Sequence, residues 1–141
     1  MRAFLDTNIL VDVLLNRSAF VSDSESLILR REALGAEMLV AWHGLATAYY
    51  LLKRGRTEQQ ALAEVDKILA WARVADCTHA SARRARSLGF PDFEDALQAA
   101  AAEASAADWL VTRNTGDFAR SRVPVLTPSQ FLQRFPLPPV S

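Results

Sequence analysis

Acidic, amide and hydroxyl side chains gather in three short stretches that lie far apart along the chain. The first holds Asp6, Thr7 and Asn8, the second Asp92, Glu94 and Asp95, and the third Thr112, Asn114 and Asp117. Oxygen ligands without a cysteine or a suitably spaced histidine select a hard divalent cation, Mg²⁺ or Mn²⁺. Such an ion keeps several waters and takes a phosphate as a further ligand. The pattern therefore indicates metal-assisted attack of water on a phosphodiester.

Bringing these carboxylates together without a cation is unfavourable. Two unit charges about 4 Å apart repel by roughly 4 kcal/mol at an effective dielectric of 20. Either the acids lie apart, or they hold protons, or a cation lies among them. Helix capping is the alternative for single residues: Asp92 with Asp95 three residues later, and Thr7 or Asn8 for the first helix. Capping does not explain an aspartate directly after one apolar strand and a further polar group after another.

Alternating strand and helix patterns must position these groups. Short apolar runs predict strands over residues 3–5, 37–41, 74–77, 109–112 and 123–126. Helical spacing and end signals predict helices over residues 8–17, 24–35, 43–55, 58–71, 79–89, 92–107 and 127–135. This alternation predicts an α/β three-layer sandwich whose central, mostly parallel sheet has about five strands. Ligands bind outside the carboxyl ends of such strands, so Asp6 and Thr112 meet if the first and fourth strands are neighbours.

Local signals add details that a structure can test. Asp23 or Ser24 caps the second helix, Thr57 and Gln60 form a capping box, and Pro128 opens the last helix. Large apolar residues are expected in the core or at the surface of a homodimer. The core set is Trp42, Trp71 and Trp109, and the possible dimer set is Leu27, Ile28, Tyr49 and Tyr50.

Composition limits the class of protein. The chain has 141 residues, which predicts a single domain over residues 1–134 followed by a Pro-rich tail over residues 135–141. Its 16 basic and 16 acidic residues cancel, which argues against non-specific coating of nucleic acid. The apolar runs are too short for a bilayer, and Asp6 interrupts any signal peptide. Cys77 is the only cysteine, which fits a reducing cytoplasm, and we expect it to be inert core.

Three motifs together resemble those of the PIN-domain family. They are "LDTNILVD" after a short strand, "DFEDALQAAAA" before a strand, and "LVTRNTGDF" after it, and the closing "VPVLTPSQFL" is also similar. The resemblance covers nearly the whole chain, and it is strongest to the single-domain, VapC-like ribonuclease toxins. It implies a Mg²⁺- or Mn²⁺-dependent endoribonuclease that cuts RNA, is often dimeric, and is inhibited by a small antitoxin protein.

The resemblance also assigns residues. The catalytic acids of the family fall on Asp6 and Asp95, its late acid-or-amide position on Asn114, and its "DF" aspartate on Asp117. We expect Asp6 and Asp95 to hold the principal ion, with Asp92 and Asp117 as further ligands directly or through water. Thr7, Asn8 and Thr112 match positions that orient these groups. Arg113, between Thr112 and Asn114, is expected to hold an RNA phosphate.

One departure from the family pattern concerns the helix after the second strand. The family commonly places a glutamate there, and this chain has no acid from His43 to Leu52. We expect the carboxylate of Asp92 to take the place of this missing metal ligand, because Asp92 and Asp95 share a helix face. Glu94 is about 100° away around the helix and could point inward or to solvent. His43 could bind the metal or a phosphate, or lie at the helix start as an ordinary surface residue.

Two other function classes compete with the nuclease. A PIN-like scaffold that lacks the glutamate could be a catalytically weakened RNA- or protein-binding module. Aspartate-based phosphotransfer proteins are disfavoured, because position 8 is Asn rather than a second Asp and "VLTPSQ" contains no lysine.

Overall fold

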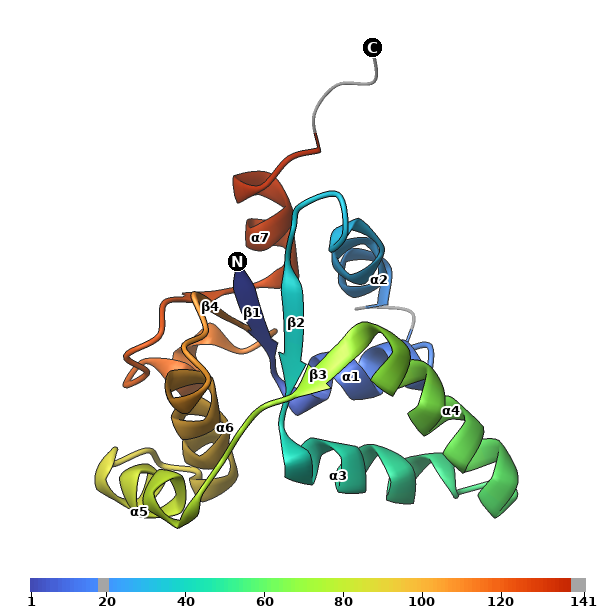
Figure 1. Cartoon of the computed structure of the whole chain (residues 1–141), viewed down its shortest axis with the longest axis horizontal. Coiled ribbons are helices and arrows are strands. Elements are labelled where there is room, and N and C mark those ends of the chain that lie inside the picture. Colours follow the sequence, from blue (N-terminus) through green and yellow to red (C-terminus); the bar gives the residue numbers. More distant parts are fainter. Residues whose placement is uncertain (18–20, 138–141) are drawn as a thin grey trace.

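A central sheet of five parallel strands organises the protein. In the computed structural model, which describes residues 1–17 and 21–137, the strand order is β3-β2-β1-β4-β5 (Figure 1). The strands are β1 Arg2–Leu5, β2 Glu37–Val40, β3 Ala72–Val74, β4 Trp109–Val111 and β5 Val125–Leu126. All four pairings are parallel, so the predicted α/β sandwich with a five-stranded sheet is confirmed. β1 and β4 are neighbours, as the meeting of Asp6 and Thr112 requires.

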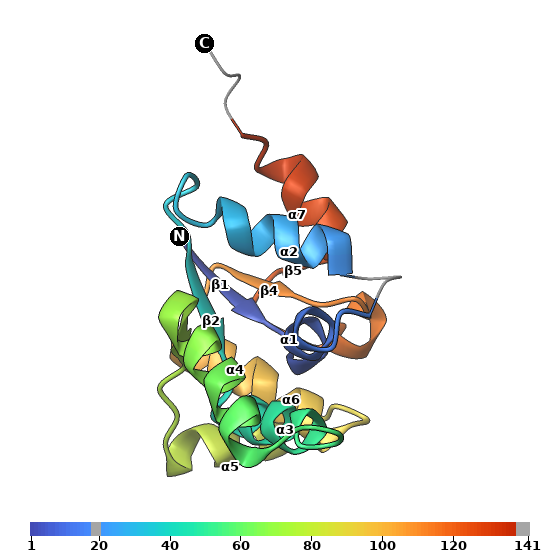
Figure 2. The ribbon, with the colours of Figure 1, turned by 90° about the vertical axis from the view of Figure 1, so that its right-hand side faces the viewer.

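Helices connect the strands and cover both faces of the sheet. They are α1 Thr7–Leu14, α2 Val21–Arg30, α3 Trp42–Leu52, α4 Glu58–Trp71, α5 His79–Ser87, α6 Phe93–Ala104 and α7 Pro128–Arg134, with a 3-10 turn, η1, at Thr115–Phe118. Parallel strands need such long connections. α2 and α7 lie on one side of the sheet, and α5 and α6 lie on the other (Figure 2). No helix in the described part of the chain is long and apolar enough to cross a membrane.

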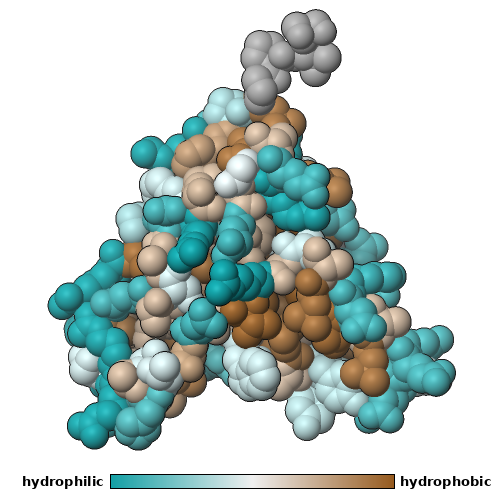
Figure 3. Space-filling view, in the orientation of Figure 1, coloured by the Kyte–Doolittle hydropathy of each residue, from teal (hydrophilic) through white to brown (hydrophobic). Residues whose placement is uncertain are grey.

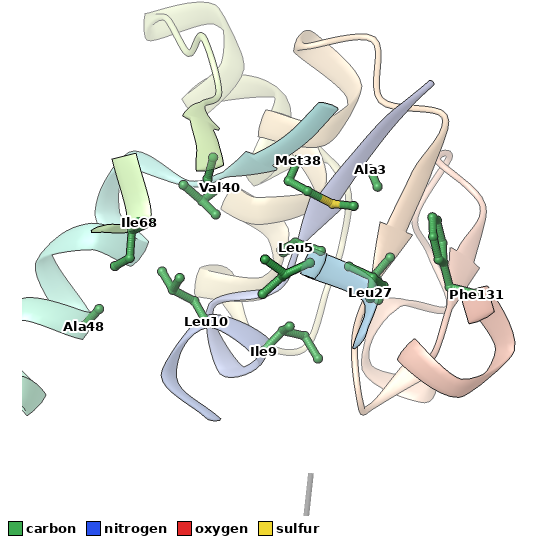
Figure 4. Close-up of a cluster of buried hydrophobic side chains, with 13 residues drawn as sticks. Ala3, Leu5, Ile9, Leu10, Leu27, Met38, Val40, Ala48, Ile68 and Phe131 are labelled. Atoms are coloured by element: carbon green, nitrogen blue, oxygen red, sulfur yellow. The ribbon is translucent and has the colours of Figure 1, made fainter. Parts of the chain in front are cut away.

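The alternation of side chains along β1 divides the core between the two faces. Ala3 and Leu5 join a cluster with Leu27 of α2, Ile68 of α4 and Phe131 of α7 (Figure 4). Phe4 points the other way and packs with residues of α6 and with Leu110 of β4. The buried part of α6 consists largely of alanines, Ala99, Ala100, Ala101 and Ala102. Small side chains bring α6 close to the sheet, which also brings its polar residues close to the strand ends.

Several boundary predictions hold and others are wrong. The capping box of Thr57 and Gln60 and Pro128 at the start of α7 are confirmed. α2 begins at Val21 rather than after a cap at Asp23 or Ser24, because Ser24 is buried inside the helix. α1 is capped by Asp6, not by Thr7 or Asn8.

The third strand begins earlier than predicted. Ala72 directly follows α4 and pairs with Met38, so the register places Val74 opposite Val40 at the end of β2. Residues 75–77 therefore run beyond the sheet. Cys77 is exposed there, and the expectation that it belongs to the core is wrong.

Two expectations about large apolar side chains are also wrong. Trp42 is 75% exposed because it opens α3 on the outer side, whereas Trp71 and Trp109 pack against the core as expected. Leu27 and Ile28 are buried within the chain and cannot form a dimer surface. The division into one domain and a tail remains a prediction, and residues 138–141 of that tail lie outside the described residues.

Candidate active site

Asp6 lies at the centre of the polar groups, at the carboxyl end of the middle strand. Its backbone N–H donates to the carbonyl of Val111, so the chain is still paired with β4 when it turns into α1. Its carboxylate caps α1, with Oδ1 accepting the N–H of Asn8 at 3.3 Å. Only 2% of Asp6 is exposed, since β1 has a paired strand on each side. A buried carboxylate of this kind needs several donors to stay ionised.

Thr112 supplies one of those donors from the neighbouring strand. Leu5 is paired with Val111, so Asp6 and Thr112 leave the sheet side by side. The Thr112 hydroxyl is buried and donates to Asp6 Oδ2 at 2.7 Å. The same hydroxyl oxygen accepts the backbone N–H of Asn114 at 3.1 Å, which ties the loop after β4 to the site.

Gln98 supplies a second donor from α6. Its buried Nε2 donates to Asp6 Oδ1 at 2.9 Å and lies 3.0 Å from each carboxylate oxygen of Glu94. Glu94 is one helical turn before Gln98, so both side chains are on the same face of α6. One amide group thus connects Glu94 to Asp6, although 88 residues of sequence from Asp6 to Glu94 separate them.

Glu94 is also held from α3. His43 Nε2 lies 3.1 Å from Glu94 Oε1, and His43 is the second residue of α3. The neighbouring Gly44 is packed against α1, because a Cβ atom there would lie 2.8 Å from Thr7 Oγ1. Close approach of α3 to α1 therefore brings His43 to the site and leaves no space for a side chain at position 44.

Asp92 and Asp95 form the outer part of the cluster. Asp92 is the N-cap of α6, and its Oδ1 accepts the N–H of Asp95 at 3.0 Å. Capping is thus a real role of Asp92. Even so, one carboxylate oxygen from each of Asp92, Glu94 and Asp95 lies within 4.8 Å of the others.

The pKa values of these acids reflect burial and mutual repulsion. Burial raises the pKa of Asp6, while hydrogen bonds from Thr112 and Gln98 act in the opposite direction. Burial, the charge of Asp92 and the adjacent Glu94 raise the pKa of Asp95 to about 7. The pKa of Glu94 is lowered: burial acts upward, and hydrogen bonds from His43 and Gln98 outweigh it. Asp95 therefore keeps its proton to a higher pH than an ordinary aspartate does, and a cation at this point would relieve the same repulsion.

Other residues of the predicted site lie differently. Asn114 and Asp117 are exposed on the loop and turn after β4, and Asn8 is exposed on α1. Arg113 Nε lies 2.9 Å from Oδ2 of Asp12, a fully buried acid of α1, and the Arg113 side chain is 21% exposed. This pairing directs the guanidinium toward α1, and a contact of Arg113 with RNA remains a prediction.

Sequence reasoning missed Gln98 and Asp12 and did not connect His43 with Glu94. Gln98 and Asp12 each had a signal of the same kind, a polar residue inside an apolar pattern. Gln98 begins the run "QAAAA", and Asp12 interrupts "ILVDVLL". Such residues are expected to pair with other polar groups when their helix face is buried.

The donors suit a hard divalent ion. The oxygens of Asp92, Glu94 and Asp95 form a compact group at a helix start, and Asp6 is joined to that group through Gln98. An all-oxygen set with several carboxylates is the environment that Mg²⁺ and Mn²⁺ prefer.

Comparisons with known proteins bear on the family and the fold of the chain. Residues 2–116 match the PIN domain family. A structure of VapBC2 from Rickettsia felis, bound to a DNA fragment from their promoter, is similar with a TM-score of 0.71, 20% identity, and coverage of 90% of this chain and 98% of that chain. The structure of VapBC-1 from nontypeable Haemophilus influenzae has a TM-score of 0.70 and 17% identity, and the match covers 92% of this chain and 99% of that chain. The structure of DNA-bound VapBC from Salmonella typhimurium has a TM-score of 0.70 and 19% identity, and the match covers 91% of this chain and 98% of that chain. No curated protein matches the sequence.

Proposed function

The chain belongs to the PIN-domain family, and on that basis we propose that it is a divalent-metal-dependent endoribonuclease and the toxin of a toxin–antitoxin pair. One observation carries the proposal. Asp6, at the carboxyl end of β1, is joined through a single amide to an acidic group at the start of α6. Acids from distant parts of the chain meet where ligands bind in parallel sheets.

Asp6, Glu94 and Asp95 would hold Mg²⁺ or Mn²⁺, with Asp92 beside them. When bound, the ion would activate water and neutralise charge on the phosphate under attack. The chain positions the ligands: Thr112 and Gln98 fix the carboxylate of Asp6, and His43 fixes that of Glu94. Asn114 and Asp117 remain candidate catalytic residues from the resemblance, with Thr7 and Asn8 in supporting roles. The substrate would be single-stranded or loop RNA in the cytoplasm.

The experiment is cleavage of a structured RNA with Mg²⁺, with Mn²⁺ and with EDTA. We expect cleavage that needs the metal and is lost in Asp6→Asn. Asp23→Asn is a matched control, because Asp23 is an exposed acid on α2 across the sheet. Cleavage that persists in EDTA, or that is unchanged in Asp6→Asn, would contradict the metal mechanism.

Two further variants test whether Glu94 or Asp92 takes the place of the glutamate that α3 lacks. Glu94 is connected to Asp6 through Gln98, whereas Asp92 faces the backbone of Asp95. We therefore expect Glu94→Gln to weaken Mn²⁺ binding more than Asp92→Asn does, as measured by titration without RNA. The opposite order would favour the original hypothesis that Asp92 compensates.

An antitoxin partner is supported by the three VapBC structures and by an apolar groove between α3 and α4. The groove has a volume of about 300 Å³ and is lined by Trp42, Leu45, Ala46, Tyr49, Leu62 and Val65. Leu62 is 47% exposed, and apolar surface is visible over α4 in Figure 3. Exposed apolar patches of this kind mark protein interaction sites. An amphipathic helix of an antitoxin would cover it.

Reading the neighbouring gene and purifying the two proteins together tests this part. A small gene that encodes a DNA-binding domain with a disordered tail is expected. Its product should co-purify with the native chain and should not co-purify with the Leu62→Glu variant. Stable binding by Leu62→Glu would place the partner elsewhere. A homodimer also remains a prediction.

A second function, that of a binding module with weakened catalysis, is favoured by one observation. α3 offers no acid, and the space nearest Asp6 is filled by the Gln98 amide. This alternative predicts RNA binding without cleavage and poor binding of Mn²⁺, which the same titrations measure.

A further inference from the structure

Gln98 is the only side chain in the described residues that donates to both Asp6 and Glu94. Its Nε2 is within hydrogen-bond distance of both carboxylates, so their oxygens lie less than about 6 Å apart. We propose that this amide is a resident substitute for a cation, which holds the two acids together in the metal-free protein and competes with the divalent ion for their oxygens. The inference rests on the proposed metal-dependent function and describes how that site is regulated.

The orientation of the amide is fixed by Thr7. Gln98 Oε1 accepts the backbone N–H of Thr7 at 2.8 Å and lies 3.2 Å from the Thr7 hydroxyl. That N–H belongs to the first residue of α1, so it has no acceptor within its own helix. Rotating the amide by half a turn would set its NH₂ group against another N–H and leave a buried donor unsatisfied. The NH₂ group must therefore face the carboxylates.

This arrangement occupies the oxygens that an ion would use. Asp6 Oδ1 accepts from Gln98 and Oδ2 accepts from Thr112, so each oxygen already has a donor. Both oxygens of Glu94 face the same amide, and one also faces His43. A cation that takes these oxygens from the Gln98 side meets the positive end of the N–H dipoles. It must displace the amide or bind with fewer ligands.

A purely structural role for Gln98 makes a different prediction. If Gln98 serves only to satisfy Thr7 and to place Asp6 and Glu94, removing it disorders the ligands and weakens metal binding. If it competes with the ion, removing its N–H groups leaves two carboxylates that need a cation, and metal binding becomes stronger. The sign of the change in affinity separates the two roles.

The test uses the full chain with Mn²⁺ as the probe and no RNA. Gln98→Met has a similar length and no donor. Gln98→Glu keeps an oxygen for the Thr7 N–H and replaces the NH₂ group with a second oxygen. Gln133→Met is the control, because Gln133 is an exposed glutamine on α7. Free Mn²⁺ is measured by electron paramagnetic resonance, and folding is checked by circular dichroism.

We expect Gln98→Met to bind Mn²⁺ about tenfold more tightly, which corresponds to the loss of one competing hydrogen bond to a charged group. Gln98→Glu should also bind more tightly, and its melting temperature should rise more on addition of Mn²⁺ than that of the native protein. Equal or weaker binding by folded Gln98→Met would overturn competition. If Gln98→Met does not fold, equal or weaker binding by Gln98→Glu would overturn it.

These outcomes are independent of RNA cleavage. If the native chain cleaves RNA with Mg²⁺ but neither variant binds Mn²⁺ more tightly, the inference about Gln98 fails and the nuclease remains. If the variants bind more tightly but no RNA is cleaved under any condition, the competition stands and the nuclease fails. If neither the native chain nor the variants bind Mn²⁺, competition is not what limits binding and the inference fails.

Discussion

Replacing Thr112 by valine tests how the site keeps a buried charge without any metal. Valine has nearly the shape of threonine and lacks the hydroxyl. In the native chain this hydroxyl donates to Asp6 Oδ2 at 2.7 Å and accepts the N–H of Asn114 at 3.1 Å. Because Asp6 is 2% exposed, water cannot replace the lost donor. Thr112→Ser keeps both hydrogen bonds and is the matched control.

The size of the effect follows from the charge on the acceptor. A hydrogen bond to a charged group contributes about 1.5–3 kcal/mol. We expect Thr112→Val to lower the free energy of unfolding by about 2 kcal/mol, and a domain of this length would then melt roughly 6 °C lower. Thr112→Ser should lose much less, because only a methyl group is removed. Urea unfolding in EDTA at pH 8 measures both variants.

The pH dependence has a definite sign. Burial raises the pKa of Asp6 and the Thr112 hydroxyl opposes that rise, so the valine variant has a still higher folded pKa. The loss of stability caused by Thr112→Val requires an ionised Asp6, so it has its full size at a pH above the pKa of Asp6 in the folded variant. It decreases as the pH falls through that pKa, since a protonated Asp6 no longer needs the donor. Equal unfolding of the valine and serine variants, or a difference that grows toward low pH, would refute the account of Asp6.

Three further predictions concern the surroundings of Asp6, all measured in EDTA. Asp95→Asn should melt about 3 °C higher than the native chain at pH 8, because the folded pKa of Asp95 is raised to about 7 and its ionised form destabilises the fold once the pH exceeds the pKa of the unfolded chain. The gain should narrow toward pH 5, and a gain independent of pH would contradict this explanation. Arg113→Met leaves the fully buried Asp12 without its closest cation and should lower the free energy of unfolding in urea by about 3 kcal/mol. Adding Asp12→Asn to the same chain should restore part of this loss, and no restoration would mean that the two residues do not act as a pair. Gly44→Ala forces Thr7 to move and should destabilise the chain by about 1 kcal/mol although alanine favours helix, and stability equal to or above native would show that α3 has room to shift.

The architecture could be predicted because its signals are local and repeated. Short apolar strands alternate with helices, and such alternation permits few arrangements other than a covered parallel sheet. That arrangement also places β1 beside β4, so Asp6 and Thr112 could be brought together from sequence alone. The third strand was placed too late because its start depends on pairing with Met38, which no local signal reports.

The partners within the site were harder to predict, because they depend on how each helix is rotated against its neighbours. Glu94 and Asp95 are adjacent in sequence and about 100° apart on α6, so composition cannot tell which one faces Asp6. The alanines after Gln98 settle the rotation by packing on the sheet, and Glu94 then shares the face of Gln98. Likewise, the pairing of Arg113 with Asp12 depends on where α1 ends relative to β4.

The absence of an acid on α3 is connected with these packing contacts. α3 approaches α1 so closely at Gly44 that a side chain there would collide with Thr7, and Thr7 in turn fixes the orientation of Gln98. The side chain that α3 does present to the site is His43, which pairs with Glu94. α3 thus contributes a donor instead of an acid, and the group of α6 that contacts Asp6 directly is the amide of Gln98. Donors within the site can hold these acids together without an ion, so we expect the native chain in EDTA to keep a folded circular dichroism spectrum and to melt in one cooperative transition. Loss of the cooperative transition in EDTA would show that the donors of Gln98 and His43 do not replace the charge of a cation.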